Sequence, residues 1–119
     1  MRHRHGFTFI EILIVVLIIA IISAIAVPNF MSASERTGRV SCIDNLRLIE
    51  SAKDQWGFVN KKDPTAVPNK KQLVGTATTG FIKTFPTCPA NGVYTIHNLR
   101  ALPTCTKLSL GHELPPRNP

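Results

Sequence analysis

The sequence of 119 residues predicts an α+β protein in which one long N-terminal helix carries a small antiparallel β-hairpin or sheet. Two observations predict the helix: a strongly apolar stretch from Phe7 to Val27, and an amphipathic pattern that follows it to about Asn60. A third observation predicts the sheet, because the rest of the chain is rich in proline and turn residues and holds short segments of alternating polarity. This length allows one small domain at most and excludes a multidomain enzyme.

The apolar stretch is long enough to cross a membrane. It has 21 residues from Phe7 to Val27, and a helix of that length is about 30 Å long, which matches the hydrocarbon core of a bilayer. Its only polar side chains are Thr8, Glu11 and Ser23. Arg2 and Arg4 precede it, so the N-terminus is expected in the cytoplasm and the C-terminal module on the other side. We therefore expect a single-pass membrane protein.

Glu11 separates the interpretations of this stretch. A signal peptide cut near Ala24–Ala26, or a plain membrane anchor, would be equally apolar but would not need a carboxylate, which is costly inside a membrane. A cut after Gly6 would create an amino group on Phe7, four residues from Glu11 and on the same helix face. That amine, from the same chain or a neighbouring subunit, would offset the charge and fix the register of helices packed side by side.

The segment Gly6-Phe7-Thr8-Phe9-Ile10-Glu11, followed by a long Ile/Leu/Val run and a proline, resembles the N-terminus of type IV prepilins and of the pseudopilins of type II secretion. The resemblance covers roughly residues 4–50. It implies a pilin-like fold, cleavage after Gly6 by a membrane prepilin peptidase, and N-methylation of Phe7. It also implies that Glu11 is the carboxylate that sets the filament register.

Pro28 lies inside the helical pattern. It removes one backbone hydrogen bond and is expected to kink the helix. Ala20 stands where many members of the resembled family have glycine, and alanine favours a helix that stays intact between Ala20 and Pro28.

An amphipathic continuation of the helix is expected over residues 30–60. Four residues share one helix face by their spacing: Cys42, Leu46, Ile49 and Trp56. Ile43 and Val59 widen this stripe. The stripe is expected to be the surface on which the C-terminal module packs. A free coiled-coil helix is the alternative, but the stripe lacks sustained heptads.

Residues 61–119 are expected to form the small C-terminal β module. Val93–Ile96 alternates as a strand would, and Pro103–Leu108 is the expected return strand. Asn91-Gly92 favours a tight turn with positive φ. Gln72–Val74 is expected to be a brief helix or an irregular segment. An isolated hairpin is marginal in water, so this module needs the long helix.

Three cysteines require an account. Cys88 and Cys105 enclose 16 residues and flank the expected hairpin, so a disulfide between them is the preferred prediction. Such a bridge would add about 3 kcal/mol on the loop-entropy model, and disulfides persist outside the cytoplasm. Cys42 would then be a packed free thiol. A bridge from Cys42 to either of the other two is the alternative, since sequence does not determine connectivity.

We expect no cofactor, no metal site and no enzymatic activity. Four residues carry zinc-binding groups: Cys88, His97, Cys105 and His112. Their spacing is not that of structural zinc sites. After Asp54 only Asp63 and Glu113 are acidic, which is too few for a calcium cage. No nucleophile–base pattern, carboxylate pair or phosphate-binding glycine loop indicates catalysis.

The expected organisation is a leader peptide at 1–6, a transmembrane and filament-core helix at 7–29, the amphipathic helix at 30–60 and the β module at 61–119. The resemblance implies a structural subunit of a type IV pilus-like or type II secretion pseudopilus filament. Such a subunit waits in the inner membrane and polymerises with copies of itself into a periplasmic or extracellular filament. The implied partners are a prepilin peptidase, an assembly ATPase, a platform membrane protein and membrane lipid. A competence pilin for DNA uptake, and a non-polymerising anchor or minor pilin, are the alternatives.

DNA is the least supported of the expected partners. The net charge is +7, and a cluster of five lysines is expected on the exposed β module: Lys61, Lys62, Lys70, Lys71 and Lys83. They would allow nonspecific contact with nucleic-acid phosphates. No aromatic residues alternate with them to stack on bases, so a solvated surface is the simpler interpretation.

Overall fold

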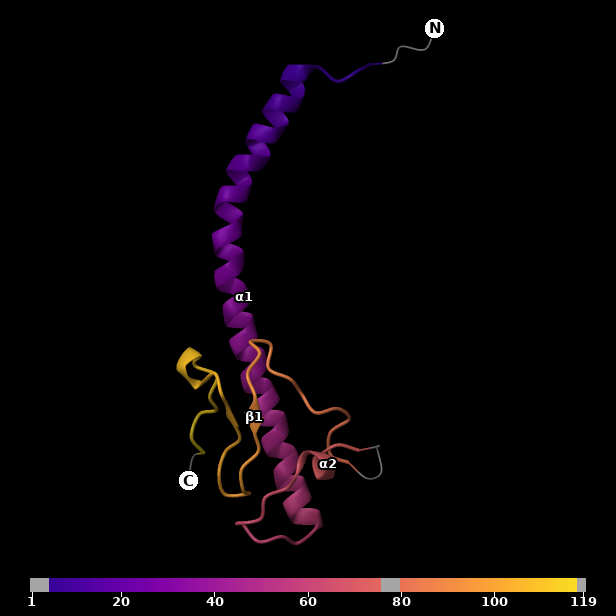
Figure 1. Ribbon diagram of the computed structural model, residues 1–119, viewed down its shortest axis with the longest axis vertical. Helices are drawn as coiled ribbons and strands as arrows, with labels where there is room; N and C mark the ends of the chain where they lie inside the picture. Colours follow the sequence, from indigo (N-terminus) through magenta and orange to yellow (C-terminus); the bar gives the residue numbers. More distant parts are fainter. Residues whose placement is uncertain (1–4, 76–79, 118–119) are drawn as a thin grey trace. The chain divides into compact units, whose positions relative to one another are not determined.

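The computed structural model of the protein describes residues 5–75 and 80–117 (Figure 1). Two helices, two strands and one 3-10 turn follow one another within these residues: α1 (Phe9–Val59), α2 (Lys70–Leu73), β1 (Tyr94–Thr95), β2 (Thr104–Cys105) and η1 (Leu108–Leu110). The predicted α+β class, with one long N-terminal helix and a small antiparallel sheet, is confirmed. Arg2, Arg4 and the rest of segment 1–4 lie outside the described residues. The chain divides into two units, Met1–Glu35 and Arg36–Pro119, which are described in turn.

The first unit consists mainly of the N-terminal part of α1. Its apolar side chains are exposed along the whole length, from Phe9 at 80% to Met31 at 62%. Pro28 is helical, as are the residues before and after it. Because proline lacks an N–H group, the helix has one backbone hydrogen bond fewer there. The kink expected at Pro28 stays a prediction.

The second unit contains a small core built on the C-terminal part of α1. The predicted stripe is confirmed, because Cys42, Leu46 and Ile49 are fully buried and Trp56 is 6% exposed. Ile43 packs against this core. The prediction for Val59 was wrong: α1 ends at this residue, and its side chain is 65% exposed.

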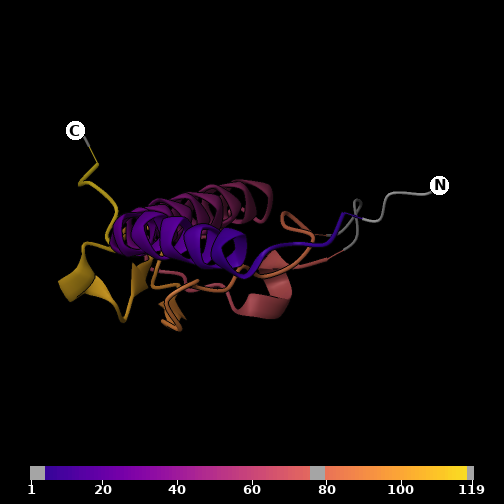
Figure 2. The same cartoon turned by 90° about the horizontal axis from the view of Figure 1, so that it is seen from above.

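Apart from Ala52 of α1, the remaining core residues come from the segments that follow the helix. They are Leu73, Ile82, Cys88, Tyr94, Ile96, Cys105 and Leu114. Figure 2 shows these later segments of the second unit gathered on one side of the C-terminal half of α1. The helix face predicted to receive the β module therefore does so.

The sheet is smaller than predicted. β1 and β2 pair antiparallel with Tyr94 opposite Cys105 and Thr95 opposite Thr104. His97 has a φ of 58° and ends the extended run after β1. Beyond the paired residues, the Val93 N–H donates to the Thr106 hydroxyl instead of continuing a regular ladder, at an N–O distance of 2.9 Å. Each strand is therefore two residues long, half or less of the predicted span.

Two predicted local features are present. The turn at Asn91-Gly92 has positive φ at Asn91, 58°, and the Asn91 N–H donates to the Cys88 carbonyl at 3.1 Å. The brief helix near Gln72 is α2, which Asn69 caps. The Asn69 side chain accepts from the Gln72 N–H, and the Gln72 side chain accepts from the Asn69 N–H.

Candidate functional site

The predicted processing site lies in an accessible segment. Gly6 and Phe7 precede α1 in non-helical backbone, and Phe7 is 83% exposed. A side chain added at Gly6 would meet nothing within 4 Å beyond its chain neighbours. The peptide bond between these residues is thus free of the helical hydrogen bonds that would hinder a peptidase. Cleavage after Gly6 and methylation of Phe7 remain predictions.

Glu11 takes part in a capping box at the start of α1. The Glu11 N–H donates to the Thr8 hydroxyl at 3.3 Å, and the Thr8 N–H donates to a Glu11 carboxylate oxygen at 3.4 Å. These bonds satisfy two of the N–H groups that a helix start leaves unpaired. A cut after Gly6 would leave both partners in place. Glu11 therefore already has a local role in the uncut chain, in addition to the predicted role in filament register.

The stretch of α1 from Ile12 to Met31 forms a large exposed apolar surface. Of the described part of the chain, only α1 is long and apolar enough to cross a membrane. Its most apolar window of 18 residues has a mean hydropathy of 3.2, and none of that window is buried. A monomer in water rarely exposes so much contiguous apolar surface. This surface is one that lipid or the helices of other subunits would cover.

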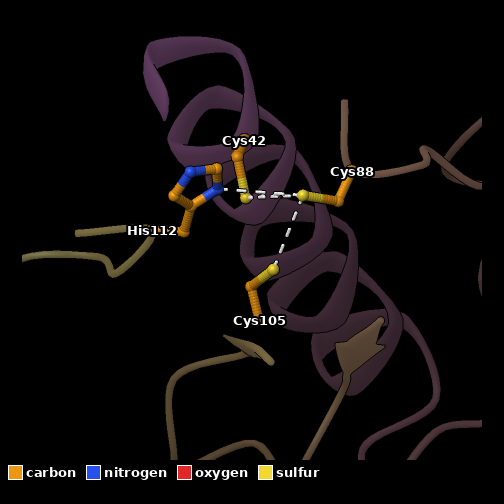
Figure 3. Close-up of side chains that lie close together, drawn as sticks. All are labelled: Cys42, Cys88, Cys105 and His112. Atoms are coloured by element: carbon orange, nitrogen blue, oxygen red, sulfur yellow. Dashed lines mark hydrogen bonds between the residues drawn. The ribbon is translucent and has the colours of Figure 1, made fainter. Parts of the chain in front are cut away.

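The second feature is a buried cluster of three thiols and one imidazole (Figure 3). Cys42 lies on α1, Cys88 begins the turn before β1, Cys105 is in β2, and His112 follows η1. The Cys88 sulfur lies 3.7 Å from the sulfurs of Cys42 and Cys105 and 3.7 Å from Nδ1 of His112. All four donor atoms lie within 4.8 Å of one another.

The surroundings shift the pKa values of Cys42 and Cys88 in opposite directions. Burial raises the pKa of Cys42 to about 12. Burial also opposes ionisation of Cys88, but the N–H groups of Ala90 and Gly92 and the neighbouring thiols outweigh it and lower the pKa of Cys88. Cys88, at the centre of the cluster, is therefore better placed than Cys42 to carry negative charge.

The structure leaves the predicted disulfide open. The three thiols are free, and Cys88 is equally close to Cys105 and to Cys42. The pairing of Cys88 with Cys105 and the alternative pairing through Cys42 thus both stay predictions. The cluster also differs from the four residues that the sequence analysis grouped. His97 donates to or accepts from the Thr104 hydroxyl at 2.9 Å, and Cys42 takes the fourth place in the cluster.

Lys61, Lys62, Lys70, Lys71 and Lys83 are all exposed. The Lys70 ammonium lies over the Phe85 ring, 4.8 Å from its centroid. This contact occupies an aromatic face that a nucleic-acid base would need for stacking. The geometry adds nothing specific in favour of DNA as a partner.

Comparison with known proteins supports the N-terminal assignment. Residues 1–27 match the family described as the prokaryotic N-terminal methylation motif. The chain is similar to the type II secretion system core protein G of Klebsiella pneumoniae, with 31% identity over 74 residues that make up 62% of this chain and 53% of the relative. It is also similar to the core protein G of Escherichia coli K12, with 28% identity over an alignment length of 105, which covers 80% of this chain and 72% of the relative.

A pilin is also among the relatives. The type IV major pilin protein PilA of Myxococcus xanthus is 44% identical over 62 residues, which make up 52% of this chain and 27% of the pilin. No solved structure is significantly similar to the chain. The chain spans about half the length of the Klebsiella relative, 53%.

The chain shares the long apolar helix, the small sheet packed on its second half and the methylation motif with pilins and pseudopilins. The resemblance to type IV prepilins and type II secretion pseudopilins is confirmed. Proteins of this kind are structural subunits rather than enzymes.

Proposed function

We propose that this chain is a structural subunit of a filament of the type II secretion pseudopilus kind. The chain is inserted in the inner membrane, cut after Gly6, N-methylated on Phe7 and polymerised with copies of itself through the N-terminal part of α1. The observation that carries the proposal is the apolar surface of α1 from Phe9 to Met31, which is exposed along its length and interrupted near its start by one carboxylate, Glu11. Such a surface needs a lipid or protein partner.

The secretion filament is favoured over the type IV pilus by the extent of the similarity. The match to the secretion protein of Escherichia coli extends over 80% of this chain, whereas the match to the Myxococcus pilin extends over 52%. The longer match includes part of the C-terminal module, the part of a pilin-like protein that faces outward. A prepilin peptidase, an assembly ATPase and a platform membrane protein are the proposed partners.

The experiment that tests the proposal is intact mass measurement with N-terminal sequencing of the protein from its own membranes. We expect a chain that begins at N-methyl-Phe7. A chain that begins near Val27 would identify an exported protein with an ordinary signal peptide. A chain that retains its leader in cells with an active prepilin peptidase would identify a plain membrane anchor. Either result would overturn the proposal.

A further inference from the structure

We propose that Cys42, Cys88, Cys105 and His112 form a structural zinc site that links the C-terminal module to the long helix. The inference is independent of the filament function, because it concerns residues of the second unit only. It differs from the expectation drawn from sequence, which grouped His97 with the other residues and found no zinc-like spacing.

Three of the six donor–donor distances in the cluster match those of a tetrahedral zinc site, and all six are within 4.8 Å. A zinc–sulfur bond is about 2.3 Å long, so two sulfurs on one tetrahedral zinc lie about 3.8 Å apart. A sulfur and an imidazole nitrogen on the same ion lie about 3.6 Å apart. The observed distances from the Cys88 sulfur to the Cys42 sulfur, the Cys105 sulfur and Nδ1 of His112 are each 3.7 Å. The thiols are thus placed for a shared ion.

The set of donors is complete and closed to solvent. Three sulfurs and one imidazole nitrogen supply four ligands, which is the number that structural zinc sites use, and leave no open position for a substrate. All four residues are buried, His112 at 3% and Cys105 at 1% exposure among them. Soft thiolate ligands favour zinc over calcium or magnesium, which prefer oxygen. Binding would release the three thiol protons to solvent as the thiolates form.

Gly92 keeps the space beside the sulfurs open. A Cβ atom at this position would lie 2.5 Å from the Cys105 sulfur and 3.1 Å from the Cys88 sulfur. The turn from Cys88 to Gly92 also directs the N–H groups of Ala90 and Gly92 toward the Cys88 sulfur. Such N–H groups are the outer contacts that orient a metal-bound thiolate. The backbone around the cluster is thus shaped for sulfur ligands.

A metal explains how so small a module holds together. The sheet has two residues in each strand, and a module of this size has little apolar core to spare. The four ligands come from α1, the turn before β1, β2 and the segment after η1. One ion would join all four segments. A disulfide would join only two of these segments, and one thiol and the buried imidazole would take no part in the cross-link.

The test uses the full chain, purified in mild detergent from its own membranes without reducing agent or chelator. We expect about one zinc per chain by elemental analysis. The three thiols should be protected from alkylation until the protein is denatured in the presence of a chelator. Replacement of zinc by Co²⁺ should give the intense absorption of tetrahedral cobalt with thiolate ligands. A metal-free chain, another metal at the same ligands, or a disulfide seen as a mass lower by two hydrogens would overturn the proposal.

Two variants add a matched comparison. His112→Ala removes a ligand, and His97→Ala removes the imidazole that bonds Thr104 outside the cluster. Loss of an outer contact typically lowers metal affinity about 10–100-fold, and His112→Ala is expected to lower zinc affinity by more than that. His97→Ala should leave zinc affinity within a factor of about two. Equal zinc affinity in both variants would overturn the assignment of His112, and the cobalt spectrum of the unaltered chain remains a test that needs no variant to fold.

Discussion

The Thr8 hydroxyl and the Glu11 carboxylate cap the start of α1 by accepting hydrogen bonds from each other's backbone N–H groups. This pairing means that Glu11 stabilises the helix as well as carrying a charge. Substitution by alanine removes both properties at once. A substitution that keeps the cap and removes the charge separates the two roles.

Glu11→Gln is expected to reduce filament assembly strongly while leaving the amount of subunit in the membrane unchanged. Glutamine can accept the bond from the Thr8 N–H, as it does in capping boxes generally, but it cannot pair with the ammonium of Phe7 in a neighbouring subunit. The measurement is the yield of sheared filaments relative to membrane-bound subunit.

Thr8→Ala is the matched control, because it removes one bond of the cap and keeps the carboxylate. It should cost about 1 kcal/mol of helix stability and leave assembly largely intact. If Thr8→Ala impaired assembly as much as Glu11→Gln, the cap and not the charge would be the property that assembly requires.

Gly92→Ala is expected to destabilise the second unit by about 1–3 kcal/mol, the usual cost of overpacking. The new methyl group would lie 2.5 Å from the Cys105 sulfur, so the sulfur cluster would have to shift. Urea unfolding of the full chain in mild detergent measures the effect. Trp56 is the single tryptophan of the sequence and is buried, so its fluorescence reports on this core.

Gly38→Ala provides the comparison with the opposite sign. A Cβ atom at Gly38 would meet only the Pro89 side chain, at an ordinary distance of 4.0 Å. Within a helix, alanine is favoured over glycine by about 1 kcal/mol. We expect a gain in stability of about that size. A loss at Gly38, or no loss at Gly92, would contradict the packing described here.

Asn45→Ala is expected to cost about 1–2 kcal/mol of unfolding free energy, because it removes two hydrogen bonds at once. The Asn45 side-chain amide donates to the Thr87 carbonyl and to the Tyr94 hydroxyl, each at 3.1 Å. These bonds attach the segment before β1, and β1 itself, to α1. Tyr94→Phe removes one of the two bonds and should cost less than Asn45→Ala in the same urea unfolding measurement.

Gln55→Ala serves as the control for side-chain amides on this helix. Gln55 bonds the Ser51 hydroxyl on the exposed face of α1, and surface changes of this kind typically stay within about 0.5 kcal/mol. If Gln55→Ala cost as much as Asn45→Ala, the bonds to Thr87 and Tyr94 would not be what stabilises the module.

The helix and its buried stripe could be predicted because their signals are local and periodic. Cys42, Leu46, Ile49 and Trp56 are a few residues apart, and helix geometry alone places them on one face. The short strands could not be delimited, because the ladder ends where His97 adopts positive φ and where the Thr106 hydroxyl replaces a backbone acceptor.

The thiol and imidazole cluster could not be predicted, because its members meet only through tertiary packing. Cys42 and Cys88 are 46 residues apart, and spacing rules for zinc sites apply to ligands supplied by short local motifs. One signal was available: Cys42 lies on the helix stripe predicted to face the β module, where the other two cysteines were expected. Lys53 was missed for a related reason. It lies between Ile49 and Trp56 on the stripe, but a charged residue is rarely buried.

Lys53 should make the stability of the second unit depend on pH. Its side chain is fully buried, and its ammonium donates to the Ala101 carbonyl at 2.6 Å. Burial, followed by the nearby charge of Arg117, lowers the pKa of Lys53 below its ordinary value of 10.5, although Asp54 and Glu50 oppose the shift. The folded state therefore releases the proton at a lower pH than the unfolded chain does.

The sign of the effect follows from proton linkage. Between the lowered pKa and 10.5 the unfolded chain binds more protons than the folded one, so this group makes stability rise with pH across that window. Below the window the full cost of burying the charge is present. Lys53→Met keeps much of the side-chain shape and removes the titrating group. We expect the difference in unfolding free energy, wild type minus Lys53→Met, to become more positive as the pH rises toward 10.5.

The difference between the two proteins is the quantity to measure, because other groups of the unfolded chain, its thiols included, also titrate at alkaline pH and their contribution is common to both. Urea unfolding followed by Trp56 fluorescence at several pH values gives the two curves. Parallel curves would show that the Lys53 ammonium is as well solvated in the folded chain as in the unfolded one. A difference that instead becomes more negative as the pH rises would show that Asp54 and Glu50 stabilise the charge more than burial disfavours it. The pKa of Lys53 would then be raised and not lowered.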